Sequence, residues 1–270
     1  MNYKTFLVDI ADKVAHVRLN RPDKANALNH DAWAELKLIF ETLDNEPSVR
    51  VIILSGEGKH FCAGIDLAYL MEQNQANQHP DEGRKRENFR RHVLWLQSTV
   101  TAIENCRKPV LAAIDNGCIG AGVDIVSACD MRYITEKGYF SVREIDMAIV
   151  ADLGTLQRLP KIISEGMARE MAFSGRKVGA EEALRIGLVN RVYVDREEML
   201  TQVMALAKSM AQKSPLTMRG TKEVMNYSRD HGVEEGLKYT ATWNSGMLFS
   251  EDLVKAVQAA MMKQEAEYRD

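Results

Sequence analysis

Cysteine is scarce in this 270-residue sequence, which has four, and no two of them form a CxxC pair. The six histidines show no spacing typical of metal ligands, so the sequence predicts no metal site. Free cysteine is among the most buried residue types, and we expect small buried thiols here. Thiols of this kind favour a reducing compartment, and we expect the cytoplasm. The four residues are Cys62, Cys106, Cys118 and Cys129.

Long apolar runs are also missing, because no stretch reaches the roughly 18 residues that a membrane-spanning helix needs. The first residues, MNYKTFLVDIADK, carry acidic side chains within their apolar stretch, which argues against a signal peptide. The last residues, AEYRD, carry no peroxisomal tripeptide. A net charge of −3 gives no general reason to expect nucleic-acid binding. We therefore expect neither a membrane nor a nucleic acid as a partner.

Three common catalytic or cofactor motifs are absent. The segment IGAG lacks the GxGxxG spacing of a dinucleotide site, because the third glycine would fall at Ile125. The segment GEGKH does not complete a GxxxxGK[ST] phosphate loop, and no serine lies in a GxSxG turn. These absences argue against nucleotide-dependent chemistry and against a serine hydrolase.

The pattern of apolar residues indicates an α/β fold up to about residue 194, with strands alternating with helices. Within this part, the polar segment 72–92 is expected to be a solvated, mobile loop. Beyond Asp195 the pattern changes to helices without strands. We therefore expect a core over 1–195 and a helical segment over 196–270. Strands are expected at 3–10, 13–19, 51–54, 109–114 and 131–134, and late helices at 196–212, 215–227, 232–248 and 250–266.

The helical segment is unusually rich in apolar side chains for its length. A short helical tail cannot bury all of these by itself, so they pack either on the core or on another subunit. Packing within one chain remains the alternative. The residues concerned are Met225, Leu237, Trp243, Met247, Leu248, Leu253 and Val257.

Three carboxylates, Asp124, Glu144 and Asp152, lie among small or aliphatic neighbours. Burying a carboxylate is costly unless it is paired, hydrogen-bonded or protonated. Carboxylates with raised pKa values can act as general acids and bases near neutral pH. The alternatives are structural: either aspartate could serve a helix start, and Glu144 could be an exposed residue paired with Arg143.

Two glycine-containing turns, Cys62–Leu67 and Gly120–Asp124, each follow an expected strand and precede an expected helix. Glycine allows a sharp turn and close approach of a ligand, and N–H groups at a helix start favour negative charge. Two such donors converging on one point would stabilise an oxygen that becomes an oxyanion. Tight turns without any ligand remain the alternative.

Four segments, spread in order over residues 19–192, resemble the crotonase (enoyl-CoA hydratase/isomerase) superfamily: LNRPDKANALN, VIILSGEGKHFCAGIDL, KPVLAAIDNGCIGAGVDIVSACDMRY and GLVNRV. VREIDMAIVADLGTLQRLPK, KSPLTMRGTKEVMNYSRDH and WNSGMLFSEDLVKAVQA are similar to its 3,5- to 2,4-dienoyl-CoA isomerases. The resemblance implies a spiral of ββα units followed by a helical trimerisation segment.

The resemblance also implies a reaction, in fatty-acid beta-oxidation, that moves a proton from C2 to C6 of an acyl-CoA thioester. Asp152 would remove the first proton, Glu144 would deliver the second, and Asp124 would support them. The backbone N–H groups of Ile65 and Ala121 would hold the thioester oxygen. No cofactor is implied beyond the coenzyme A of the substrate. The residues implied in substrate binding are Lys24, Ala25, Ala63, Gly64, Ile65, Asp66, Leu67 and Ala121.

Self-association as a trimer or hexamer and a bacterial-type cytosolic location complete the expectations drawn from the resemblance. Two alternatives stay open: an enoyl-CoA hydratase or 3,2-enoyl-CoA isomerase, and a non-catalytic acyl-CoA- or RNA-binding homologue. Asp124 is one methylene shorter than the glutamate of hydratases, which argues against hydration. Ala121 stands where most relatives have glycine, which retains the N–H donor but adds a methyl group. Asp66 could instead cap a helix over 66–73.

Overall fold

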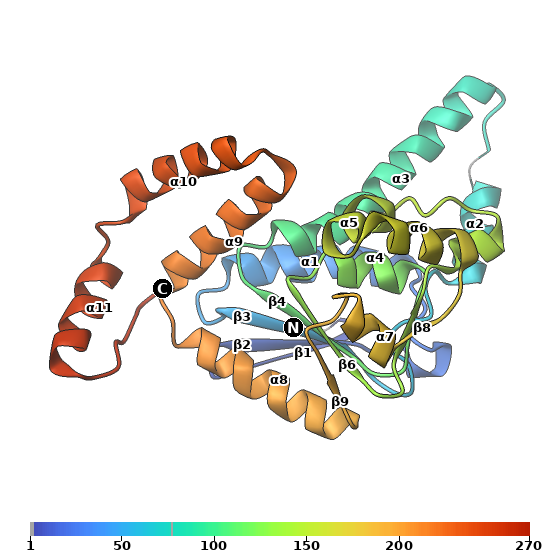
Figure 1. Ribbon diagram of the computed structural model, residues 1–270. Helices are drawn as coiled ribbons and strands as arrows, with labels where there is room; N and C mark the ends of the chain where they lie inside the picture. Colours follow the sequence, from blue (N-terminus) through green and yellow to red (C-terminus); the bar gives the residue numbers. More distant parts are fainter. Residues whose placement is uncertain (1–2, 77) are drawn as a thin grey trace.

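The computed structural model describes residues 3–76 and 78–270 and is built around a six-stranded sheet (Figure 1). The first two strands are antiparallel, and each later pair is parallel. The two central strands are buried along their whole length, as expected of parallel strands covered on both faces. In spatial order the strands are β1 (Phe6–Ala11), β2 (Val14–Leu19), β3 (Val51–Gly56), β4 (Val110–Ile114), β6 (Met131–Thr135) and β9 (Arg191–Tyr193).

Alternate residues of the sheet belong to two different cores, because successive side chains of a strand point to opposite faces. Ile52 and Leu54 pack in the larger core, whereas Val51 and Ile53 pack in the smaller one. The smaller core is closed by one helix, α8 (Arg196–Ala211). The larger core is covered by α1 (His30–Asn45), α3 (Glu82–Asn105), α4 (Ala121–Ser127), α5 (Thr155–Ile162) and α6 (Glu165–Ser174).

A second, three-stranded sheet carries one of the two glycine-containing turns. It consists of β5 (Gly117–Ile119), β7 (Tyr139–Ser141) and β8 (Val178–Gly179). A single bridge between Cys62 and Cys118 joins the loop after β3 to β5. The segments that leave β3 and β4 therefore run side by side. The remaining short elements are η1 (Pro22–Lys24), α2 (Leu67–Ala76), η2 (Arg143–Met147) and α7 (Ala180–Arg185). Three longer helices follow in the C-terminal part: α9 (Pro215–Asp230), α10 (Val233–Met247) and α11 (Glu251–Met262).

The prediction of a mobile loop over 72–92 is wrong. Most of this segment is helical, because α2 continues to Ala76 and α3 begins at Glu82. The side chain of Asp81 caps α3 by accepting a hydrogen bond of 2.8 Å from the Arg84 N–H. The charged residues that suggested a loop instead lie on exposed helix faces, as in the pair Lys85–Glu82. Asn77 lies outside the described residues.

The last three helices, α9 to α11, form what we call the arm, which extends from the body of the molecule (Figure 1). α8 does not belong to it, because its buried face packs on the sheet. The expected division at residues 195 and 196 thus stays a prediction, and the change in packing comes one helix later. No helix in residues 3–76 and 78–270 is long and apolar enough to cross a membrane.

The hairpin of α9 and α10 depends on a close approach at Gly220. A methyl carbon added there would lie 2.1 Å from Cζ2 of Trp243. We expect Gly220→Ala to displace the indole ring and to cost about 1–3 kcal/mol of stability in thermal or urea unfolding. Gly246→Ala on α10 is the matched control, since a methyl there meets nothing within 4 Å. Equal stability of the two variants would contradict this packing.

Candidate active site

The turn at Gly64 is held by a short ladder to residue 28. The Leu28 N–H donates to the Gly64 carbonyl at 2.8 Å, and the Asp66 N–H donates to the Leu28 carbonyl at 3.0 Å. Ile65 lies between these two bonds as the bridge partner of Leu28. Because neighbouring amides of an extended segment point to opposite sides, the Ile65 N–H points away from this ladder. It is thus oriented to meet a ligand.

The turn at Gly120 supplies the second donor. Gly120 has a φ of 53°, a conformation that favours glycine, and Ala121 is the first residue of α4. The first N–H groups of a helix have no intrahelical partner. A Cβ placed on Gly64 would lie 3.5 Å from the Ala121 nitrogen, so the two turns are in contact. The structure thus brings the predicted donors Ile65 and Ala121 together.

Glu144 lies over the turn at Gly120. Its Oε1 is 3.3 Å from the position of a Cβ on that glycine. Its Oε2 is buried and has no hydrogen-bond partner among the described residues. Burial raises the pKa of Glu144, and the nearby Asp152 raises it further. The alternative of a Glu144–Arg143 pair is wrong, because Arg143 forms its ion pair with Asp146 at 3.2 Å.

Asp124 is buried on α4, and its carboxylate reaches the next helix. Oδ1 accepts a hydrogen bond of 2.6 Å from the backbone N–H of Thr155, the first residue of α5. Burial, followed by the charge of Glu144, raises the pKa of Asp124 to about 7. The structural alternative is therefore partly right, since Asp124 does serve a helix start, but that of α5. The same carboxylate lies in the electrostatic field of Glu144.

Asp152 does not cap α5, because the N-cap residue is Gly154. The residue is exposed in the single chain, yet its carboxyl group is enclosed enough that desolvation raises its pKa. His92 acts in the opposite direction and lowers the pKa of Asp152. The backbone of Asp152 is fixed by Gln97, whose side-chain amide donates to the Asp152 carbonyl at 2.7 Å.

An aromatic cluster near Asp152 was not anticipated from the sequence. The rings of His30 and His92 stack on Trp95 with centroid distances of 5.5 and 5.7 Å. The Tyr69 hydroxyl lies 3.4 Å from Nε2 of His92. These residues come from α1, α2 and α3, so no local spacing could have indicated the cluster.

The predicted substrate-binding segments also lie together. The Ala63 N–H donates to the Ala25 carbonyl at 3.0 Å, which places Lys24 and Ala25 beside the turn at Gly64. Asp66 pairs with Arg21 at 3.0 Å and also accepts a hydrogen bond from the Ala68 N–H. Asp66 therefore shapes the loop and supports the start of α2, which begins at Leu67.

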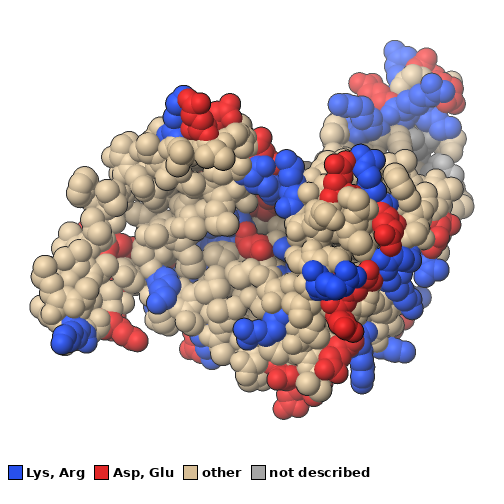
Figure 2. Space-filling view, viewed as in Figure 1, with Lys and Arg blue, Asp and Glu red and all other residues tan. Residues whose placement is uncertain are grey.

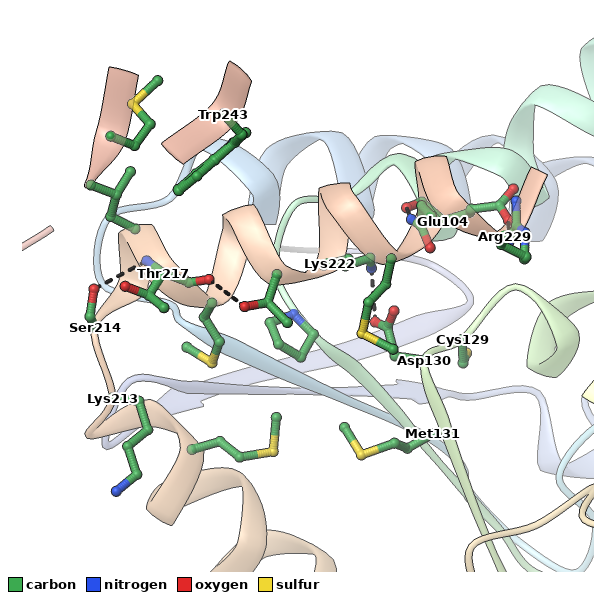
Figure 3. Close-up of a pocket in the computed structure, with 18 of the residues that line it drawn as sticks. Glu104, Cys129, Asp130, Met131, Lys213, Ser214, Thr217, Lys222, Arg229 and Trp243 are labelled. Atoms are coloured by element: carbon green, nitrogen blue, oxygen red, sulfur yellow. Dashed lines mark hydrogen bonds and ion pairs between the residues drawn. The ribbon is translucent and has the colours of Figure 1, made fainter. Parts of the chain in front are cut away.

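The carboxylate site is distinct from a large groove under the arm. That groove has a volume of about 1000 Å³, and its lining includes Met131, Lys222 and Trp243 (Figure 3). Asp124, Glu144 and Asp152 do not line it. In the described ranges, 3–76 and 78–270, no group of three or more His, Cys, Asp or Glu side chains could hold a metal ion.

Comparison with known proteins identifies the family. The family model described as enoyl-CoA hydratase/isomerase matches residues 9–270. The chain belongs to this family. It is 47% identical to the peroxisomal Delta(3,5)-Delta(2,4)-dienoyl-CoA isomerase of Arabidopsis thaliana, over 99% of this chain and 98% of the relative. It is 46% identical to the mitochondrial enzyme of that name from Mus musculus, over 98% of this chain and 81% of the relative.

The solved structures agree with the family assignment. The crystal structure of an enoyl-CoA hydratase from Bacillus anthracis has a TM-score of 0.88 at 29% identity and covers 98% of this chain and 99% of that one. The predicted α/β fold of the crotonase type is thereby confirmed.

The prediction of a cytoplasmic location is wrong. The two isomerases named above are peroxisomal and mitochondrial proteins. The prediction depended in part on the thiols, and all four cysteines are free and buried. Burial protects a thiol in any compartment, so these residues report packing and cannot identify a compartment.

The raised pKa of Asp124 gives a prediction for stability. The pKa of Asp124 is about 7 in the folded protein and about 4 in the unfolded chain, so the folded state binds the carboxyl proton more tightly. The free energy of unfolding should therefore fall as the pH rises from about 4 to about 7. Asparagine does not ionise, so Asp124→Asn should avoid this fall in stability. The variant should be more stable than the parent at pH 8, by up to about 4 kcal/mol, but not at pH 4.

Urea unfolding across this pH range measures the effect. Asp146→Asn is the control, because Asp146 is exposed and pairs with Arg143. A stability difference for Asp124→Asn that stays constant from pH 4 to pH 8 would contradict the assigned pKa.

Proposed function

We propose that this protein is an enzyme that isomerises 3,5-dienoyl-CoA to 2,4-dienoyl-CoA. The observation that carries the proposal is the position of Glu144. Its Oε1 lies against Gly120, in the turn that presents the Ala121 N–H, and its Oε2 is buried without a hydrogen-bond partner among the described residues. The two relatives at 46–47% identity, both dienoyl-CoA isomerases by name, support it. We propose no cofactor beyond the coenzyme A that forms part of the substrate.

The thioester oxygen would be bound by the N–H groups of Ile65 and Ala121. Deprotonation at C2 turns this oxygen into the oxyanion of an enolate, and two fixed donors stabilise the new charge more than they stabilise the substrate. The donors come from two turns in contact, so no reorganisation is needed when the charge appears. The adenine end of coenzyme A would lie along Lys24 and Ala25.

The proton shift would use two carboxylates in different protonation states. Asp152 takes the C2 proton as its carboxylate, and the electron pair forms the C2=C3 bond. The C3=C4 pair moves to C4=C5, and the C5=C6 pair takes a proton from the Glu144 carboxylic acid at C6. Burial raises the pKa of both Glu144 and Asp152, and at Asp152 the charge of His92 opposes this rise. We therefore assign the carboxylate to Asp152 and the acid to Glu144.

Asp124 would act on Glu144 through charge. Two carboxylates in one desolvated site do not ionise together, so the pair retains a proton to higher pH than either group alone. A hydratase needs two carboxylates that both hold one water molecule. Here one oxygen of Asp124 is already bound to the Thr155 N–H, which argues against that arrangement.

Conservative substitutions of the acid and the base test the proposal. We expect Glu144→Gln and Asp152→Asn each to lower kcat for 3,5-dienoyl-CoA by about 10²–10⁴, with binding of coenzyme A thioesters retained. The matched control is Asp146→Asn, because Asp146 lies in the same 3-10 turn as Glu144 but is exposed. Spectroscopic assay of the conjugated product gives kcat and KM.

A substrate panel separates the alternatives. Faster turnover of 2-enoyl-CoA than of the diene would instead support a hydratase, and faster turnover of 3-enoyl-CoA would support a 3,2-enoyl isomerase. Unchanged behaviour of both variants, with thioester binding but no turnover by the parent, would support a non-catalytic acyl-CoA-binding protein.

We also propose that the chain assembles as a trimer or a dimer of trimers through residues 196–270, chiefly through the arm. The surface of the arm is largely free of charge on the face shown in Figure 2, and it is separated from the body by a hollow. Val233, Leu237 and Phe249 are exposed at 81%, 65% and 91% in the single chain. Isolated apolar residues are common on protein surfaces, but a cluster of exposed apolar residues of this size is typical of an interface.

Light scattering tests the assembly. The parent is expected at three or six chains, and Leu237→Glu together with Phe249→Glu should shift it toward the monomer, because each places a charge in an apolar contact. A monomeric mass for the parent would contradict the proposal.

A further inference from the structure

Glu104, at the end of α3, lies between two guanidinium groups from different parts of the chain. Its Oε2 accepts hydrogen bonds from Nη2 and Nε of Arg158 at 2.8 and 3.2 Å. Its Oε1 accepts from Nη1 of Arg229. Figure 3 shows Glu104 and Arg229 facing each other at the end of α9. The Glu104 side chain is only 15% exposed, so these charges are partly removed from water.

Arg158 connects this carboxylate to the segment that carries Asp152. Its Nη1 donates to the Leu153 carbonyl at 3.3 Å, and its guanidinium covers Gly154, where an added methyl would lie 1.8 Å from Nη1. Gly154 has a φ of 128°, which a side chain would strain. The segment is thus fixed on both sides of Leu153, by Arg158 and by the bond between Gln97 and the Asp152 carbonyl.

Arg229 connects the same carboxylate to the arm, because it lies in the last turn of α9. Asn226, one turn earlier, donates to the Glu104 backbone carbonyl at 3.4 Å. On the other side, Arg229 is held by Asp230 at 2.6 Å. The end of α9 is therefore attached to α3 through Glu104, and the same carboxylate forms the ion pair with Arg158.

We propose that Glu104, Arg158 and Arg229 form an ion network that positions Asp152. Through this network, the position of Asp152 depends on the contact between the end of α9, in the arm, and α3. Glu104 and Arg158 are positioning residues, since neither belongs to the proposed reacting groups. Without the carboxylate, two partly buried guanidinium groups would face each other with no counter-charge between them. Arg158 would then keep, besides its bond to the Leu153 carbonyl, only the 3.2 Å hydrogen bond from its Nη2 to the Thr101 hydroxyl, and its hold on the Leu153 carbonyl would weaken.

The electrostatics of Glu104 agree with this role. Burial would raise its pKa, but hydrogen bonds from Arg158 and Arg229 hold the pKa below its usual range. Glu104 is therefore charged at neutral pH, and the network is intact where the enzyme would work. The link has a functional consequence, because displacing a reacting group by about 1 Å can cost on the order of 10²-fold in rate.

The test compares Glu104→Gln and Arg229→Gln with the control Lys238→Gln, which removes an exposed ion pair of the arm between Lys238 and Glu234. This network depends on the proposed function only for its kinetic readout. We expect kcat for 3,5-dienoyl-CoA to fall about 10- to 100-fold in both network variants, with KM little changed. The double variant should be no worse than Glu104→Gln, because both act through one network.

Hydrogen exchange provides a readout that does not depend on activity. Backbone amides of residues 153–158 should exchange faster in Arg229→Gln than in the parent, and Lys238→Gln should leave them unchanged. Faster exchange in a protein that does not turn over the diene would support the network and refute the proposed function. Exchange at 153–158 unchanged in Arg229→Gln, or kcat within twofold of the parent, would overturn the network.

Discussion

The contact between the turn at Gly64 and the turn at Gly120 is the constraint on which the site depends. Each turn follows a buried parallel strand, and the bridge between Cys62 and Cys118 holds the two segments side by side. A Cβ on Gly64 would lie only 3.1 Å from the Ile119 carbonyl oxygen, and the φ of 95° at Gly64 would strain any side chain. The fold thus places two N–H groups together by backbone geometry alone, and the carboxylates are arranged around that point.

Burying these carboxylates costs free energy, and the rest of the molecule offsets that cost only in part. Asp124 and Glu144 are desolvated near each other, which disfavours charge on both. One oxygen of Asp124 accepts a hydrogen bond of 2.6 Å at the start of α5, but Oε2 of Glu144 is buried without a hydrogen-bond partner in residues 3–76 and 78–270. Unsatisfied buried groups are rare in native structures and are expected where a substrate completes the site.

The sequence was informative wherever the structure is determined by local patterning. The continuous apolar run Val51–Leu54 predicted a buried strand, the glycine turns predicted the donor loops, and the three carboxylates stood out by their apolar neighbours. The helix at 82–92 was missed, because its charged residues lie on an exposed surface and resemble those of a loop. Contacts between distant segments, such as Glu104 with Arg229 or His30 with Trp95, have no local signature. The compartment could not be inferred from thiols that are buried.

The central claim is that a proton leaves C2 and another arrives at C6, and the position of solvent deuterium in the product tests it directly. The carboxylic acid of Glu144 exchanges its proton with solvent before it reacts. Turnover of 3,5-dienoyl-CoA in heavy water should therefore give 2,4-dienoyl-CoA with deuterium at C6, as read by proton and deuterium NMR. Deuterium at C4 in a 2,5-dienoyl product, or a hydroxyl group at C3, would contradict the account.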